Sequence, residues 1–146
     1  MSAKKSSAIE ANIPTEAEAI AVQFWIPGPP VGKQRARVVN GHAYTPKKTV
    51  DYEKHIKRCG AIAALKSQSR LNRAEWVRLI ITINFGLDKR RPDCDNVLKS
   101  VMDGLQGVFW ATDKNVVPSV RAVWLNCLRP GIAVEIREYI PLDANG

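Results

Sequence analysis

The chain has few cysteines, and their arrangement excludes the common cysteine-based frameworks. Only three of its 146 residues are cysteines, an odd and widely spaced set made up of Cys59, Cys94 and Cys127. No Cys-x-x-Cys pair is present, and neither His42 nor His55 flanks a cysteine at the spacing of a zinc site. We therefore expect no disulfide framework and a reducing, cytoplasmic environment.

The sequence also lacks long apolar runs, internal repeats and a glycine-rich phosphate loop. Its longest apolar stretch is far shorter than the roughly 20 residues of a membrane helix, and no basic segment leads into an apolar one. No basic amphipathic helix with an exposed aromatic face is predicted, so we expect no membrane partner. Hydrophobic residues nevertheless make up 45% of the chain, which excludes global disorder and suits one compact domain.

Positive charge exceeds negative charge. The chain has 22 Lys and Arg against 14 Asp and Glu, a formal charge of +8. Such an excess favours a polyanionic partner, nucleic acid first, although net charge also serves solubility alone. The charge is unevenly placed: most of the basic excess precedes Pro92, and seven of the 14 acidic residues follow it.

The spacing of apolar residues predicts an α+β fold, a single domain with a mixed β-sheet and two main helices. Residues 1–18 are small and polar and are predicted to be a disordered tail, which leaves 19–146 as the folded domain. Strands are predicted at 19–26, 76–85, 116–125 (broken or bulged near Pro118) and 132–140, and helices at 45–66 and 95–106. The expected apolar face of the second helix consists of Leu98, Val101, Met102 and Leu105.

Two aspartates, Asp93 and Asp95, stand two residues apart where the second helix is predicted to begin. In an extended segment they face the same way, and two such close carboxylates repel unless a proton or a cation lies between them. A hard divalent cation with oxygen ligands, usually Mg²⁺, suits this pair. Asp113, in the loop after the helix, joins them if that loop returns to the helix start. Lys99, one turn beyond the pair, is placed to bind a substrate phosphate oxygen.

The same residues have structural alternatives. Asp93, Asp95 or Asn96 can cap the helix, Lys99 can form an i,i+4 ion pair with Asp95 or Asp103, and Asp113 can be a turn former. The basic surroundings favour the metal site, because phosphodiester hydrolysis needs cations for the DNA backbone and carboxylates for the metal. The candidate DNA-binding residues are Lys89, Arg90 and Arg91 beside the pair, and a second row, Lys33, Arg35 and Arg37, which shares one face if extended.

One long segment resembles a known family. The run R-P-D-C-D-N-V-L-K-S-V-M-D-G-L-Q-G-V-F-W-A-T-D-K-N-V-V, Arg91–Val117, resembles the signature of RusA-type Holliday junction resolvases. In that family a D-x-D-N-x-x-K helix start is followed by an acidic residue just before a Q/N-V-V strand. Pro27–Pro30 with the basic row after it, and the segment Tyr44–Tyr52, are weaker matches. The likeness extends over about residues 20–140.

The resemblance implies a homodimeric, Mg²⁺-dependent endonuclease that nicks four-way DNA junctions symmetrically, in recombination and repair. It implies that Asp93, Asp95 and Asp113 hold one or two metal ions and that Lys99 lies at the substrate phosphate, making these four the catalytic residues. Family members often have two adjacent acidic residues in the loop after the helix, whereas Thr112 precedes Asp113 here. The approximate two-fold symmetry of a four-way junction independently favours a C₂ dimer.

Two other functions fit the same residues. In one, the protein is a non-catalytic DNA-binding module whose aspartates are helix caps; in the other, it is a less selective metal-dependent nuclease acting on flaps or RNA. Phe109, Trp110 and Trp124 are candidates for a dimer surface, but each is expected in the core. Cys94, between the two aspartates, is expected to be a small buried filler.

Overall fold

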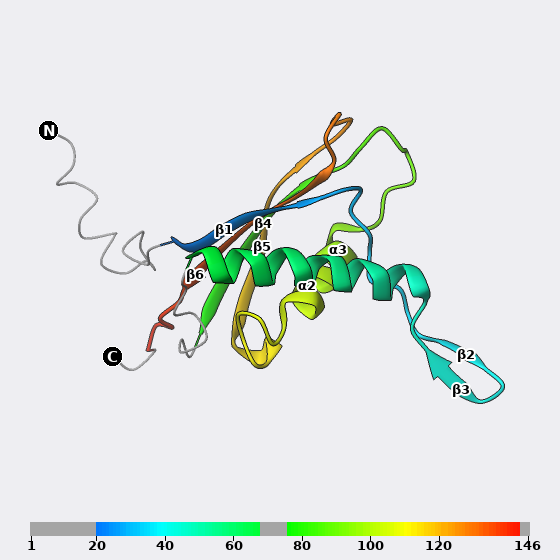
Figure 1. Cartoon of the computed structure of the whole chain (residues 1–146), viewed down its shortest axis with the longest axis horizontal. Coiled ribbons are helices and arrows are strands. Elements are labelled where there is room, and N and C mark those ends of the chain that lie inside the picture. Colours follow the sequence, from blue (N-terminus) through cyan, green and yellow to red (C-terminus); the bar gives the residue numbers. More distant parts are fainter. Residues whose placement is uncertain (1–19, 68–75, 144–146) are drawn as a thin grey trace, which may run out of the picture.

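The computed structural model describes residues 20–67 and 76–143, in which two helices cover one face of a four-stranded sheet (Figure 1). In chain order the elements are β1 Ile20–Pro27, β2 Arg37–Val39, β3 His42–Tyr44, α2 Lys47–Ser67, β4 Val77–Asn84, α3 Cys94–Leu105, the 3₁₀ helix η3 Asp113–Asn115, β5 Val116–Trp124 and β6 Gly131–Glu138. The predicted α+β class, mixed sheet and two main helices are confirmed, and the predicted elements agree with these bounds to within two residues. The predicted tail, 1–18, lies outside the described residues.

The sheet has the order β1-β6-β4-β5, in which β5 runs parallel to β4 and the other neighbours are antiparallel. The parallel pair needs a crossover connection, and α3 supplies it. Pro118 of the edge strand β5 itself pairs regularly with Leu79 of β4, and the predicted irregularity of β5 lies three residues further on, at Arg121. An edge strand tolerates the missing N–H of proline. The register shifts by one residue between the pairs Ile81–Val120 and Thr82–Ala122, which leaves Arg121 as the extra residue on β5.

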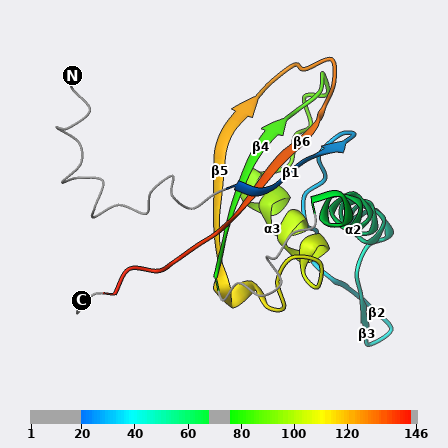
Figure 2. The same ribbon diagram turned by 60° about the vertical axis from the view of Figure 1, so that its left-hand side comes forward.

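The core lies between the sheet and the helices, which stand on the same side of the sheet (Figure 2). In β4 the alternate residues Val77, Leu79, Ile81 and Ile83 are buried, and the residues between them are half-buried. This period of two shows that the central strand turns one face to the helices and the other outward. No helix in the described ranges is long and apolar enough to cross a membrane.

Helices α2 and α3 approach each other closely at two glycines. A Cβ atom on Gly104 would lie 2.7 Å from Cγ2 of Ile56, and one on Gly60 would lie 2.5 Å from Cδ2 of Leu105. The face of α3 that is buried is therefore centred on small residues as well as apolar ones: Val97, Ser100, Val101, Gly104 and Leu105. The predicted apolar face does pack on the core: Val101 and Leu105 are buried, and Leu98 and Met102 are half-buried against it.

Of the three aromatic residues expected in the core, two are there. Phe109 and Trp110 are buried after the end of α3. Trp124 is 60% exposed, so the expectation for it is wrong. It ends the edge strand β5 opposite Asn84, on the face of the sheet that the helices leave uncovered. Cys94 is half-buried and packs against the core, as a filler does.

Strands β2 and β3 form a hairpin that projects from the body of the molecule (Figure 1). Its turn residues Asn40 and Gly41 have φ values of 52° and 78°, the left-handed conformations that a two-residue hairpin turn requires. Every residue of both strands is exposed. The hairpin therefore presents Arg37 to solvent at a distance from the core.

We expect Gly104→Ala to destabilise the fold by about 1–3 kcal/mol, the usual cost of overpacking. The added Cβ meets Cβ and Cγ2 of Ile56 and the backbone oxygen of Glu53, none of which can move without shifting a helix. Urea unfolding followed by circular dichroism measures the change. Gly86→Ala is the control, since its Cβ would meet Pro130 at an ordinary 3.4 Å. Equal unfolding midpoints for the two variants would contradict the close approach.

Candidate active site

The aspartate pair lies at the N-terminal end of α3. Asp93 is the N-cap residue, with φ −65° and ψ 143°, yet its side chain makes no capping hydrogen bond. Asp95 follows in the first turn, where a negative charge suits the helix dipole. Both side chains are exposed. Asp93 thus occupies the capping position without using its carboxylate there, and both carboxylates face solvent.

Lys99 is exposed on α3, one turn beyond Asp95. Among the described residues the ion pairs shorter than 4 Å do not include one between Lys99 and Asp95 or Asp103. The structural alternative of an i,i+4 pair is therefore not realised. Lys99 lies in the N-terminal half of the helix, and its side chain is exposed.

Asp113 follows the C-terminal end of α3 in the sequence and is the first residue of η3. Its Oδ1 accepts a hydrogen bond of 2.8 Å from Nε1 of Trp110. The 12 residues of α3 span about 18 Å and separate Asp113 from the helix start. The loop after α3 therefore does not bring Asp113 back to Asp93 and Asp95 within one chain, and the prediction that it does so is wrong.

Carboxylate oxygens suit a hard divalent cation, so the chemistry of Asp93, Asp95 and Asp113 fits the expected metal. Their placement in one chain does not complete a site. Across residues 20–67 and 76–143, no group of three or more His, Cys, Asp or Glu side chains is close enough to hold a metal ion. One chain therefore supplies the Asp93–Asp95 pair without a third ligand.

The loop after β1 lies directly on the first turn of α3. A Cβ atom on Gly32 would lie 2.8 Å from Cβ of Pro92 and 3.1 Å from Cβ of Asn96. The backbone N–H of Lys33 donates a 2.8 Å hydrogen bond to the carbonyl oxygen of Asn96. This contact fixes the segment that carries the aspartate pair.

The side chain of Lys33 ties the same loop to both helices. Its Nζ lies 2.8 Å from Oε2 of Glu53 on α2 and 2.9 Å from Oδ2 of Asp103 on α3. The hydrogen bonds to Glu53 and Asp103 raise the pKa of Lys33 above its ordinary value. Residues 28–36 form no strand, so the predicted common face of Lys33, Arg35 and Arg37 is wrong. Arg35 and Arg37 are exposed, whereas Lys33 turns inward.

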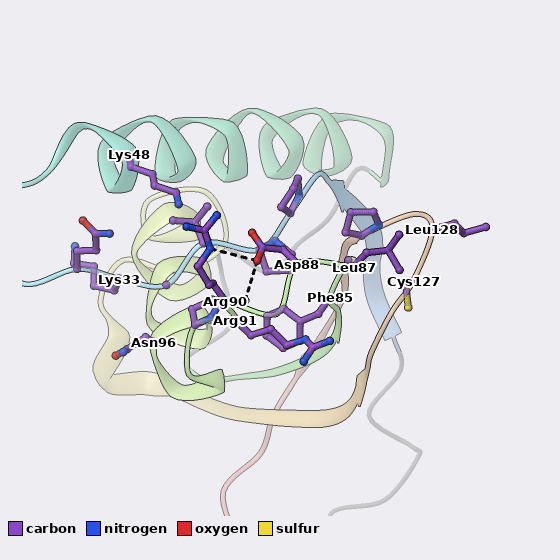
Figure 3. A pocket seen from close by; sticks show the side chains of 18 residues that line it. Lys33, Lys48, Phe85, Leu87, Asp88, Arg90, Arg91, Asn96, Cys127 and Leu128 are labelled. Atoms are coloured by element: carbon purple, nitrogen blue, oxygen red, sulfur yellow. Dashed lines mark hydrogen bonds and ion pairs between the residues drawn. The ribbon is translucent and has the colours of Figure 1, made fainter.

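The other predicted basic group borders a pocket of about 920 Å³ (Figure 3). Arg90 and Arg91 line it together with Lys33 and Lys48, whereas Lys89 is exposed and does not line it. Sequence reasoning missed Lys48. A signal was available, because Lys48 lies in the first turn of α2, where a cation opposes the helix dipole unless an anion is near.

Two hydrogen bonds hold the arginines in place. The backbone N–H of Arg90 donates to Oδ1 of Asp88 at 2.8 Å, and this bond, helped by the Arg90 side chain, lowers the pKa of Asp88. Nη2 of Arg91 donates to Oδ1 of Asn126 at 3.1 Å. Four cations and one ionised carboxylate thus line the pocket, which Pro92 and Asn96 connect to the aspartate pair.

A protein-family model described as endodeoxyribonuclease RusA matches residues 27–137, a span that includes every candidate site residue from Lys33 to Asp113. The chain belongs to the RusA family. No curated protein matches the sequence. The family is that of the RusA Holliday junction resolvases, which are metal-dependent nucleases, so this RusA-family chain is an enzyme that cleaves DNA. Membership confirms the resemblance and argues against a non-catalytic DNA-binding module.

We expect Lys33→Met to lower the free energy of unfolding by about 1 kcal/mol at neutral pH, since partly exposed ion pairs contribute modestly. Because the pKa of Lys33 is raised on folding, its contribution is complete below the ordinary value of 10.5. It is lost as the pH rises through the folded-state pKa. Urea unfolding of wild type and Lys33→Met at pH 8 and above pH 11 measures the effect. The difference between their free energies of unfolding should be smaller at the higher pH.

The matched control for this change is Lys54→Met, an exposed lysine on the same helix α2 as Glu53. Its effect on the free energy of unfolding should be within about 0.5 kcal/mol. If the gap between wild type and Lys33→Met were the same at both pH values, the ion pairs of Lys33 would not be its cause.

Proposed function

We propose that this RusA-family enzyme is a Mg²⁺-dependent resolvase that cuts four-way DNA junctions by paired symmetric nicks, in recombination and repair. The observation that carries the proposal is the exposed Asp93–Asp95 pair at the start of α3, next to a pocket lined by cations. Cations that hold a phosphate backbone against metal-binding carboxylates are the parts that phosphodiester hydrolysis requires.

Each residue has one role in this proposal. Asp93 and Asp95 present oxygen ligands for Mg²⁺, and the ion, when bound, activates water and neutralises charge on the phosphate. Lys99 binds a phosphate oxygen from the N-terminal half of α3 and stabilises the negative charge that develops there. The backbone contacts come from Arg35, Arg37, Lys89, Arg90 and Arg91. Lys33, which is engaged with Glu53 and Asp103, positions the loop instead of contacting DNA.

The third ligand, Asp113, comes from a second copy of the chain in this proposal. Within one chain the length of α3 separates Asp113 from the pair, and a helix cannot shorten without losing its hydrogen bonds. In a C₂ dimer every contact occurs twice, so the partner's Asp113 completes each pair and two sites form. Two equivalent sites are also what paired nicks on opposing strands require.

Asp95→Asn should reduce nicking of a synthetic four-way junction by more than about 100-fold, because even residues that merely support metal ligands contribute 10–100-fold. Junction binding, measured by gel shift without Mg²⁺, should be retained, since the change removes no cation. Asp51→Asn is the control, an exposed carboxylate on α2 that pairs with the exposed Lys47. Nicking by Asp95→Asn at the wild-type rate would refute the catalytic assignment.

The same assay separates a resolvase from a less selective nuclease. Wild-type protein with Mg²⁺ is given a four-way junction, a flap, a duplex, a single strand and an RNA, and the cuts are mapped on each strand. Paired cuts confined to the junction are expected. Equal rates on all of these substrates would mean that the chain is a general metal-dependent nuclease.

Mixing Asp95→Asn with Asp113→Asn tests the shared site. In a mixed dimer, one site combines the intact Asp93–Asp95 pair of the Asp113→Asn chain with the intact Asp113 of the Asp95→Asn chain. The other site contains both substitutions. We therefore expect the mixture to nick one strand of the junction where each variant alone nicks neither. Mixed dimers without any nicking, with their formation checked by mass spectrometry, would place Asp113 in the site of its own chain.

A further inference from the structure

We propose that the pocket beside the start of α3 binds one unstacked nucleotide of the DNA substrate. We call it the nucleotide pocket; its lining residues used below are Lys48, Phe85, Leu87, Arg90, Arg91 and Leu128. The inference rests on the proposed cleavage at Asp93 and Asp95 and adds a specificity site next to it. It goes beyond backbone contacts, because the pocket takes up a base.

The pocket is built from loops that the sheet and backbone hydrogen bonds hold together. The N–H of Gly28 donates to the carbonyl oxygen of Pro130 at 3.0 Å, which joins the loop after β1 to the β5–β6 connection. Phe85 exchanges backbone hydrogen bonds of 2.8 Å with Trp124 and Cys127. The walls are thus formed before a ligand binds, and about 920 Å³ lies within the size range of small-molecule sites.

One end of the pocket is apolar. Phe85, Leu87, Cys127 and Leu128 gather on one side in Figure 3, away from Lys33, Lys48 and Asn96. Leu87 is 65% exposed and Leu128 is 89% exposed, and they lie on two different loops. Exposed leucines at the mouth of a pocket suit an apolar, flat ligand that removes them from water. A nucleobase has such faces.

The other end is basic and adjoins the aspartate pair. Lys48 and Arg90 line it, and the one carboxylate among the lining residues, Asp88, already accepts hydrogen bonds from Arg90. The guanidinium of Arg91 extends toward the apolar end, because its Nη2 donates to Asn126, the residue before Cys127. Asn96, also in the lining, directly follows Asp95.

The two ends together fix the polarity of the ligand. A phosphate at the basic end lies beside the proposed cleavage site, and the attached base reaches the apolar end. Taking a base out of a duplex costs a few kcal/mol, and less where pairing is already broken. The pocket therefore favours DNA with an unpaired or easily opened nucleotide next to the scissile phosphate, as at a branch point, over continuous duplex.

The test uses four-way junctions that carry 2-aminopurine, a base that fluoresces when it is unstacked, at successive positions around the branch point. Wild-type protein is added without Mg²⁺, so that binding is observed without cleavage. We expect a rise in fluorescence at the position next to each mapped nick. Nicking of the unlabelled junction with Mg²⁺ is measured in parallel, so that failure of the pocket and failure of the proposed function are distinguishable.

Two pocket variants and two matched controls identify the cause of the signal. Leu128→Gln should remove the fluorescence rise and weaken junction binding about tenfold, equivalent to 1.4 kcal/mol, with duplex binding unchanged. Lys48→Met should lower the slope of log affinity against log salt by about 1. Leu65→Gln, at an 81% exposed leucine of α2, and Lys54→Met should leave the fluorescence and the salt slope unchanged.

The outcomes separate cleanly. A position-specific rise in 2-aminopurine fluorescence supports the pocket if Leu65→Gln and Lys54→Met keep it and Leu128→Gln loses it. A protein that nicks junctions but shows no rise at any position, or the same rise in Leu128→Gln, overturns the pocket and leaves the resolvase function standing. A rise without any nicking supports the pocket and overturns the resolvase function.

Discussion

The close approach of α2 and α3 is the constraint on which the remaining structure depends. Ile56 of α2 packs on Gly104 of α3, and Leu105 of α3 packs on Gly60 of α2, so the position of α3 has little freedom. Because α3 also connects the parallel strands β4 and β5, its packed position constrains how β5 lies at the edge of the sheet. The same packed position determines where Asp93 and Asp95 lie. The close packing at Gly60 and Gly104 thus determines the position of the aspartate pair.

This arrangement places the basic and acidic side chains of the site in separate groups. Cations from α2 and from the loop after β4 line one pocket, and the paired carboxylates begin the helix beside it. A net charge of +8 describes the whole chain but hides this division. Lys33 is the exception among the basic residues, because Glu53 and Asp103 neutralise it inside the fold. Its charge stabilises the loop and helices instead of the DNA.

The secondary structure could be predicted from the sequence because it follows from local periodicity. The alternation in β4 and the three- and four-residue spacing in α2 and α3 depend on near neighbours only. Lys33, Trp124 and Asp113 were misplaced because their surroundings come from distant segments. Nothing near Lys33 indicates that Asp103 lies beside it, and the length of α3 alone keeps Asp113 from the pair. The pocket, built by four segments, has no signature in any one of them.

The crossover role of α3 has a consequence for the candidate active site. Helix α3 lies in the chain between β4 and β5, which pair in parallel, so the aspartate pair stands on the connection that joins these two strands. The carboxylates and the pocket beside them are therefore positioned by one and the same connection.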